Sequence, residues 1–179
     1  MKIYTRAGDD GTTGLLFGGR VRKDADPIEV NGAVDEAQAM LGMARALAGE
    51  ASELNEILTS LERDLYVLMA EVATLPESRS KLKEGASLVT KEMVDALETQ
   101  IDAISERFVF PKEFVIPGQN PVAAALDVAR TVVRRAERLS VSYGLENSYV
   151  TPYLNRLSDL VWSLARWQEG DEFILAKEK

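Results

Sequence analysis

Apolar residues recur every three or four positions over most of this chain, which is the spacing of one face of an α-helix. The clearest run covers residues 54–75, where the alternation continues until Pro76. Four further runs cover residues 29–49, 90–104, 120–144 and 151–168. Each run has one apolar face that must be buried against another element. We therefore predict an all-α fold, a five-helix up-and-down bundle over residues 28–179 in a single domain.

Two of the predicted helices begin with a capping side chain followed by proline. Asn120 precedes Pro121, and Thr151 precedes Pro152. Asparagine and threonine accept hydrogen bonds from the free N–H groups at a helix start, and proline fits the first helical position. These pairs set the expected starts of the fourth and fifth helices.

The segments between the helices show no convincing pair of strands. Residues 77–89 are polar with mixed charges, which predicts an exposed connection. Phe114 lies in a short piece bracketed by Pro111 and Pro117, and this piece is predicted to be extended.

The N-terminal segment, residues 1–27, is rich in glycine and has no helical period, which predicts a loop-like arm. Glycines let backbone N–H groups approach an anion, threonine hydroxyls add donors, and cationic side chains supply charge. The sequence contains neither a Walker-type motif nor the glycine pattern of a dinucleotide-binding domain. Asp9 is expected to reach a metal or to hold the loop. Taken alone, such a segment is also typical of a flexible arm.

The fourth predicted helix carries charged residues at spacings of three, four and three, which place them on one face. These residues are Asp127, Arg130, Arg134 and Glu137. The planar fork of an arginine side chain fits phosphate and carboxylate oxygens, so two arginines one turn apart predict an anion clamp. The alternative is a ladder of ion pairs on a solvated surface.

Composition narrows the possible chemistry. The net charge of -8 argues against a general nucleic-acid binder, so an anionic ligand would need a local basic pocket. The absence of cysteine and histidine excludes disulfides, Cys/His zinc sites, histidine-based catalysis and the Glu-x-x-His iron sites of some bundles. No apolar run approaches the length of a membrane span, so we expect a cytoplasmic protein with no membrane partner.

Five ordered blocks resemble the PduO-type ATP:cob(I)alamin adenosyltransferases over nearly the whole chain. The blocks are residues 5–13, 34–36, 114–118, 129–138 and 153–160. The resemblance implies a homotrimer of five-helix subunits, with ATP and the corrinoid bound at subunit interfaces. It also implies transfer of the 5′-deoxyadenosyl group of ATP to the cobalt of cob(I)alamin, giving adenosylcobalamin and triphosphate in the presence of Mg²⁺.

The resemblance also implies a role for individual residues of the ATP site. The N-terminal arm would wrap the triphosphate, Arg130 and Arg134 would meet ATP, and Glu137 would orient the nucleotide or the arginines. Asn155 would lie near the phosphates and Mg²⁺, which would be held mainly by the phosphates. The arm residues expected to bind ATP are Thr5, Arg6, Gly8, Asp9, Gly11, Thr12, Thr13 and Lys23.

On the corrinoid side, the resemblance implies that Phe114 lies beneath the corrin and that Asp35 pairs with Arg130 across the interface. With Arg134, these residues form the expected catalytic set. Alternatively, Phe114 is a core aromatic, Asp35 a helix-surface carboxylate and Asn155 a solvent-facing amide. A flavin-type reductase and an adenosylcobalamin-dependent acceptor enzyme are the expected protein partners.

Three positions depart from the usual pattern of the family that the chain resembles. Gln119 stands where glycine is common, Asp127 where histidine is common, and Trp162 where phenylalanine is common. We expect Asp127 to pair with Arg130, one turn away, and to lower the availability of that arginine for ATP. A second hypothesis is a noncatalytic bundle in which ATP orders the arm and changes the binding of a protein partner.

Overall fold

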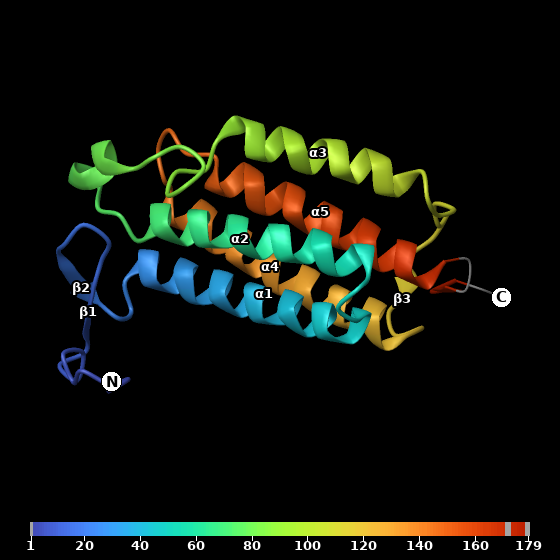
Figure 1. Cartoon of the computed structure of the whole chain (residues 1–179), viewed down its shortest axis with the longest axis horizontal. Helices are drawn as coiled ribbons and strands as arrows, with labels where there is room; N and C mark the ends of the chain where they lie inside the picture. The colour runs from blue at the N-terminus through green and yellow to red at the C-terminus, as the bar shows by residue number, and fades with distance from the viewer. Residues whose placement is uncertain (1, 171–172, 178–179) are drawn as a thin grey trace.

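Five α-helices of alternating direction form the body of the molecule (Figure 1). The computed structural model describes residues 2–170 and 173–177, so the remaining residues of the predicted arm and bundle lie outside the described part. The helices are α1 (Asp26–Ala48), α2 (Glu53–Val72), α3 (Lys91–Ser105), α4 (Pro121–Tyr143) and α5 (Val150–Glu169). The prediction of an all-α, five-helix up-and-down bundle is confirmed.

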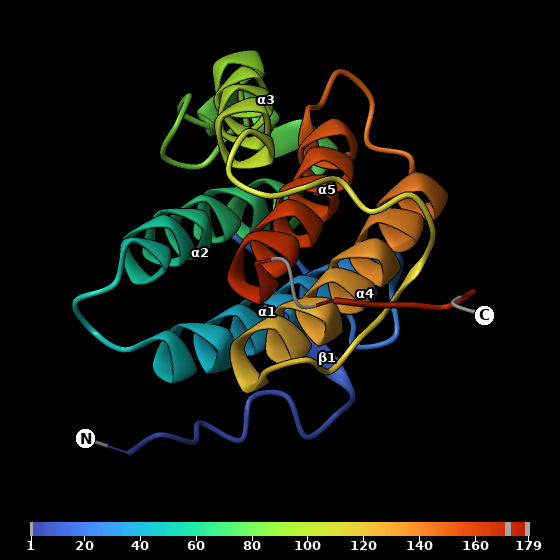
Figure 2. The ribbon, with the colours of Figure 1, turned by 90° about the vertical axis from the view of Figure 1, so that its right-hand side faces the viewer.

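The helices pack so that α5 lies between α3 and α4, while α1 packs against both α2 and α4 (Figure 2). The buried faces are largely leucine, valine and alanine, and Leu41, Leu65, Leu126 and Leu157 are fully inaccessible to solvent. Burial of these side chains drives the association of the helices. It also fixes α4 and α5 side by side in opposite directions.

The start of α4 follows the predicted capping pattern, whereas the start of α5 does not. The Asn120 side chain accepts a hydrogen bond from the N–H of Ala123 at 2.9 Å. Helix α5 begins at Val150, before the predicted Thr151, and its N-cap residue makes no side-chain capping bond. Instead, the Ser148 hydroxyl accepts from the Val150 N–H and donates to Glu71. A tertiary contact therefore sets this helix start.

The prediction of no strand pair was wrong. Strands β1 (Thr12–Gly14) and β2 (Arg20–Arg22) form an antiparallel hairpin, and β3 (Val115–Ile116) pairs with β4 (Ile174–Leu175). Strands of two or three residues are too short to display an alternating pattern. The predicted loop-like arm thus contains a hairpin.

The hairpin tip docks on the end of α2. The N–H of Leu16 donates to the carbonyl oxygen of Ala73 at 2.8 Å. Gly19 has φ +87, a conformation that favours glycine, and a β-carbon there would lie 2.6 Å from Leu75 Cδ1, so the leucine side chain would have to move. The arm is therefore attached to the bundle at its tip.

The segment predicted as an exposed connection is largely exposed, and it is also anchored to the core. It contains the 3₁₀ helix η1 (Pro76–Lys81). The fully buried Glu71 carboxylate accepts hydrogen bonds from Arg79 and from the N–H of Val89, both at 2.8 Å. Polar composition correctly indicated exposure for most of the segment, and the bonds to the buried carboxylate anchor it. Within the described ranges, no helix combines the length and apolar composition needed to cross a bilayer.

Candidate functional site

Two rows of polar side chains face each other where α4 packs against α5, and we call this line the α4–α5 seam. At one end, Arg166 Nη2 donates to Asp127 Oδ2 at 2.6 Å. At the other end, Asn155 Nδ2 donates to Glu137 Oε1 at 2.7 Å. Asp127 and Glu137 mark these ends on α4 and lie ten positions apart, about 15 Å along the helix. The seam consists of Asp127, Arg130, Arg134 and Glu137 on α4 and Asn155, Asp159, Trp162 and Arg166 on α5.

The two arginines predicted to form an anion clamp lie in the middle of the seam. Arg130 Nε donates to Asp127 Oδ1 at 3.2 Å, which confirms the predicted pairing. Arg134 Nη1 lies 4.0 Å from Glu137 Oε2, and its side chain is half exposed. Asp127 is only 4% exposed, so this end of the row is not a solvated surface ladder. Both guanidiniums are therefore held by carboxylates beside them.

Asn155 is half-buried and bonded on both sides, so it is not a solvent-facing amide. While its Nδ2 donates to Glu137, its Oδ1 accepts from Arg156 Nη1 at 2.8 Å. Burial raises the pKa of the neighbouring Asp159 above its ordinary value, and Arg156 and Arg134 oppose this rise. Charges of both signs thus surround this end of the seam.

A cavity of about 570 Å³ opens at the Arg130 end of the seam, and we call it the Phe114 cavity. Arg130, Trp162 and Arg166 line it together with the segment around Phe114. Phe114 is 85% exposed, so the alternative of a core aromatic is wrong. Its carbonyl oxygen accepts from the Ala176 N–H at 2.7 Å, which ties this segment to β4. The cavity combines an aromatic wall with arginine side chains.

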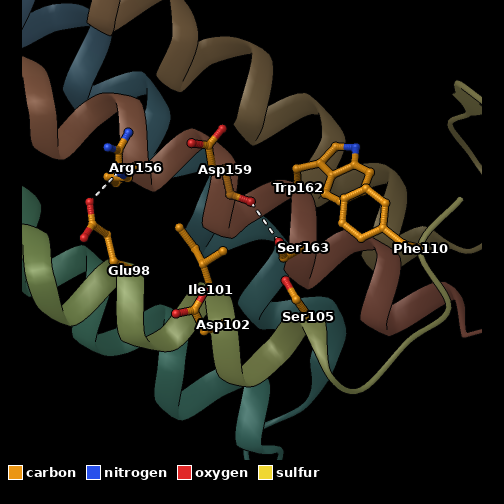
Figure 3. A pocket seen from close by; sticks show the side chains of 9 residues that line it. All are labelled: Glu98, Ile101, Asp102, Ser105, Phe110, Arg156, Asp159, Trp162 and Ser163. Atoms are coloured by element: carbon orange, nitrogen blue, oxygen red, sulfur yellow. Dashed lines mark hydrogen bonds and ion pairs between the residues drawn. The ribbon is translucent and has the colours of Figure 1, made fainter. Parts of the chain in front are cut away.

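A second cavity of about 470 Å³ lies between α3 and α5 (Figure 3). Phe110 and Trp162, whose ring centroids are 5.1 Å apart, line both cavities and separate them. Arg156 is the one cation that lines the second cavity, and its Nε donates to Glu98 at 2.7 Å. Because three carboxylates also line this cavity, it is less suited to an anion than the Phe114 cavity.

The predicted phosphate-binding loop in the arm is held mainly by Arg20, which sequence reasoning did not select. Arg20 Nη2 donates to the Ala7 carbonyl oxygen at 2.5 Å and to the Thr12 hydroxyl at 2.7 Å. The Thr12 hydroxyl in turn donates to Asp10 at 2.8 Å, so its proton is engaged. Asp10, rather than Asp9, holds the loop. Arg20 could be selected only once the register of the hairpin is known, because this register pairs Arg20 with Gly14 and so brings it to β1.

Several of the other predicted arm residues gather around the same loop. The N–H of Lys23 donates to the Gly11 carbonyl oxygen at 2.9 Å. A β-carbon on Gly8 would lie 3.1 Å from Lys23 Nζ, so the ammonium group sits directly over this glycine. Thr5, Arg6 and Asp9 are exposed, and Thr13 is half-buried in β1. The loop therefore presents cations and backbone groups to solvent.

Comparison with known proteins identifies the family. Residues 3–168 match the family model described as cobalamin adenosyltransferase. The chain belongs to this family.

Relatives of this adenosyltransferase-family chain match most of its length. A corrinoid adenosyltransferase from Citrobacter freundii is 40% identical over 171 residues, covering 94% of this chain and 95% of the relative. A corrinoid adenosyltransferase from Bacillus subtilis is 38% identical over 172 residues, covering 93% of this chain and 86% of the relative. A solved structure of a variant PduO-type ATP:corrinoid adenosyltransferase from Lactobacillus reuteri, complexed with cobalamin and ATP, superimposes with a TM-score of 0.83. The two sequences are 30% identical, and the match covers 94% of this chain and 91% of the relative.

A single copy of the adenosyltransferase-family chain does not connect all the predicted site residues. Among the residues that the structure describes, no hydrogen bond or ion pair joins the arm to the α4–α5 seam. Asp35 is exposed on α1, and none of the ion pairs found in the described part includes it. The seam and the Phe114 cavity are assembled within one chain, whereas the arm and Asp35 stand apart.

Proposed function

We propose that this chain is an ATP:cob(I)alamin adenosyltransferase, a transferase that moves the 5′-deoxyadenosyl group of ATP to the cobalt of a corrinoid. One observation carries the proposal: Arg130, one turn from Arg134, lines a cavity whose aromatic wall includes Phe114 and Trp162. This arrangement places anion-binding groups beside an apolar surface, as a triphosphate and a corrin ring require. Family membership and the cobalamin and ATP bound to the Lactobacillus reuteri relative support it.

In the proposed reaction, the protein positions two substrates and neutralises charge. The electron pair of Co(I) forms a bond to C5′ of ATP, the C5′–O bond breaks, and its electrons leave with triphosphate. Arg130 and Arg134 bind ATP from α4, Glu137 orients the arginines, and Asn155 lies near the phosphates. The arm supplies the remaining groups, which are Thr5, Arg6, Gly8, Asp9, Gly11, Thr12, Thr13 and Lys23. Together these residues lower the activation barrier, because they align C5′ of ATP with the cobalt and stabilise the charge that develops on the leaving oxygen.

Phe114 acts in a different step, the formation of Co(I). A lower axial base on cobalt opposes reduction of Co(II). An apolar ring in the place of that base leaves Co(II) four-coordinate and easier to reduce. The exposed position of Phe114 at the cavity supports this role, because its ring is available to a ligand.

The phosphates of ATP would hold most of the coordination of Mg²⁺, which would neutralise part of the triphosphate charge. The side chains support this assignment. Within residues 2–170 and 173–177, no group of three or more carboxylates gathers as a metal site. The Oδ1 atom of Asn155 already accepts a bond from Arg156, so Asn155 would lie near the bound Mg²⁺ without being its main ligand.

The complete site lies between copies of the chain in a homotrimer. Residues 1–27 form the ATP-binding arm of one copy, and the helical bundle of residues 28–179 provides the seam of the next. The exposed Asp35 pairs with Arg130 of the adjacent copy. The separation of arm and seam within one chain supports this assembly. The enzyme acts in the cytoplasm, receives electrons from a flavin-type reductase and hands its product to an adenosylcobalamin-dependent enzyme.

The direct test is conversion of cob(I)alamin under anaerobic conditions with ATP and Mg²⁺. The visible spectrum should change to that of adenosylcobalamin, and triphosphate should appear in equal amount. ATP binding without any conversion would overturn the proposal and favour a noncatalytic ATP-responsive interaction module.

A further inference from the structure

A buried network of charged side chains forms part of the wall of the Phe114 cavity. Arg166 is 2% exposed, and its guanidinium contacts two carboxylates. Its Nη2 lies 2.6 Å from Asp127 Oδ2, and its Nε lies 2.7 Å from Glu169 Oε2. Both carboxylates are also buried, so these charges depend on one another rather than on water.

Asp127 connects this buried network to the seam. One of its oxygens accepts from Arg166, and the other accepts from Arg130 Nε at 3.2 Å. The side chain of Arg130 remains 27% exposed and lines the cavity. Among residues 2–170 and 173–177, the Arg130 guanidinium donates no other hydrogen bond. Its two terminal nitrogens therefore remain available as donors. Asp127 therefore holds the inner edge of the guanidinium and leaves the outer edge for a ligand.

The same buried arginine also contacts an aromatic wall of the cavity. The Arg166 guanidinium lies 5.6 Å from the centre of the Trp162 ring. Trp162 and Arg130 both line the Phe114 cavity. The buried Arg166 side chain thus contacts two residues that line this cavity, Asp127 and Trp162.

We infer that Arg166 is a positioning residue that acts through Asp127 to hold the Arg130 fork toward the phosphates of ATP. The inference rests on the proposed function and adds a residue that acts on ATP binding through another side chain. A buried ion pair is weak evidence for stability, because desolvation offsets most of the attraction between the charges. Fixing the orientation of a ligand-binding arginine gives the network a function that stability alone does not provide.

The test measures ATP binding by calorimetry on the full-length protein, together with its thermal unfolding midpoint. Asp127→Asn is nearly isosteric and removes the charge that links the two arginines. Arg166→Met removes the buried guanidinium, and Arg166→Lys keeps its charge without the fork. The control is Arg107→Met, because Arg107 also contacts a carboxylate, Glu53, and the ring of Trp167, but lies away from the seam.

We expect Asp127→Asn and Arg166→Met each to weaken ATP binding about tenfold, the usual size of one lost charge-assisted contact. Arg166→Lys should recover part of this loss, and Arg107→Met should bind ATP like the parent. The effect of Arg166→Met should also be smaller when Asp127 is already asparagine, because the link to Arg130 is then broken.

Several outcomes would overturn the inference. If Asp127→Asn and Arg166→Met unfold at lower temperature but bind ATP like the parent, the network is structural only. If Arg166→Met does not fold, Asp127→Asn decides by the same criterion. Independent effects of the two substitutions on ATP binding would also contradict a role of Arg166 through Asp127. If the parent binds no ATP, the proposed function fails and the positioning role with it, which separates this failure from the others.

Discussion

The α4–α5 seam and the N-terminal arm are both expected to bind ATP, but they are held in place by different means. The seam lies on two helices whose opposite faces are buried, and its Asp127 and Arg166 are themselves inaccessible. The arm loop depends on hydrogen bonds of Arg20, which is exposed together with Asp10. Water and salt compete with such exposed contacts. We therefore expect the seam to be preformed and the arm to rearrange when ATP binds.

The largest expected effect follows from breaking the packing beneath the seam. Leu126 is fully buried on α4, so Leu126→Ala should lower the free energy of unfolding by about 2–5 kcal/mol. Ile3 in the arm is fully exposed, so Ile3→Ala should change it by less than about 0.5 kcal/mol. Urea unfolding measures both variants. Equal losses would mean that the arm is as firmly packed as the seam.

At the apolar end of the seam, Phe114→Ala should separate binding from chemistry. Conversion that starts from Co(II) should fall by roughly a hundredfold, the size expected when a reacting centre is misplaced. ATP binding should change little, because the arginines of the seam remain. EPR of Co(II)alamin with the variant and ATP reads the coordination of cobalt directly. Parental amounts of four-coordinate cobalt and a parental rate would refute the role of Phe114.

Within the seam, Arg134→Lys keeps the charge but loses the planar fork. ATP binding should weaken by roughly 1–3 kcal/mol, the cost of a charge-assisted contact. Arg138→Lys is the matched control, because Arg138 is exposed one turn further along the same helix. An ATP titration that gives the same affinity for Arg134→Lys and the parent would favour an ion-pair ladder without ligand.

The smallest expected effect concerns pH and lies away from both regions. Burial raises the pKa of Asp64 above its ordinary value of 3.8, although a hydrogen bond from Tyr153 opposes the rise. The folded state therefore binds this proton more tightly, and the protein loses stability as pH rises from the ordinary pKa to the raised one. Asp64→Asn can still accept from Tyr153 and does not ionise. In urea unfolding, the free energy of unfolding of Asp64→Asn minus that of the parent should increase as pH rises through this range. A difference that stays constant with pH would contradict the raised pKa of Asp64.

Helical periodicity was sufficient to predict the bundle because each helix buries one regular face. It was not sufficient for the ends of elements that are fixed by tertiary contacts. Glu71 binds Arg79 and the N–H of Val89, so the largely exposed segment 77–89 is anchored to the core at these residues. The short strands were missed for a related reason, since two or three residues carry no period.

For the candidate site, sequence reasoning placed Arg130 and Arg134 on one helix face but did not select Arg166 on α5. Arg166 reads as an ordinary helix residue until α4 and α5 are placed side by side, when it meets Asp127. Arg20 similarly gains significance only from the hairpin register. Spacing within a helix is readable from sequence, whereas pairing between elements depends on how they pack.

The claim that arm and seam act together across copies is tested most directly by subunit complementation. One variant carries Lys23→Ala in the arm, and the other carries Arg134→Ala in the seam. Each variant alone should be nearly inactive in cob(I)alamin conversion. After the two are unfolded and refolded together, activity should return to a clear fraction of the parental rate, because mixed assemblies place an intact arm beside an intact seam. If the two variants form mixed assemblies but activity does not return, each site lies within one chain and the account is wrong.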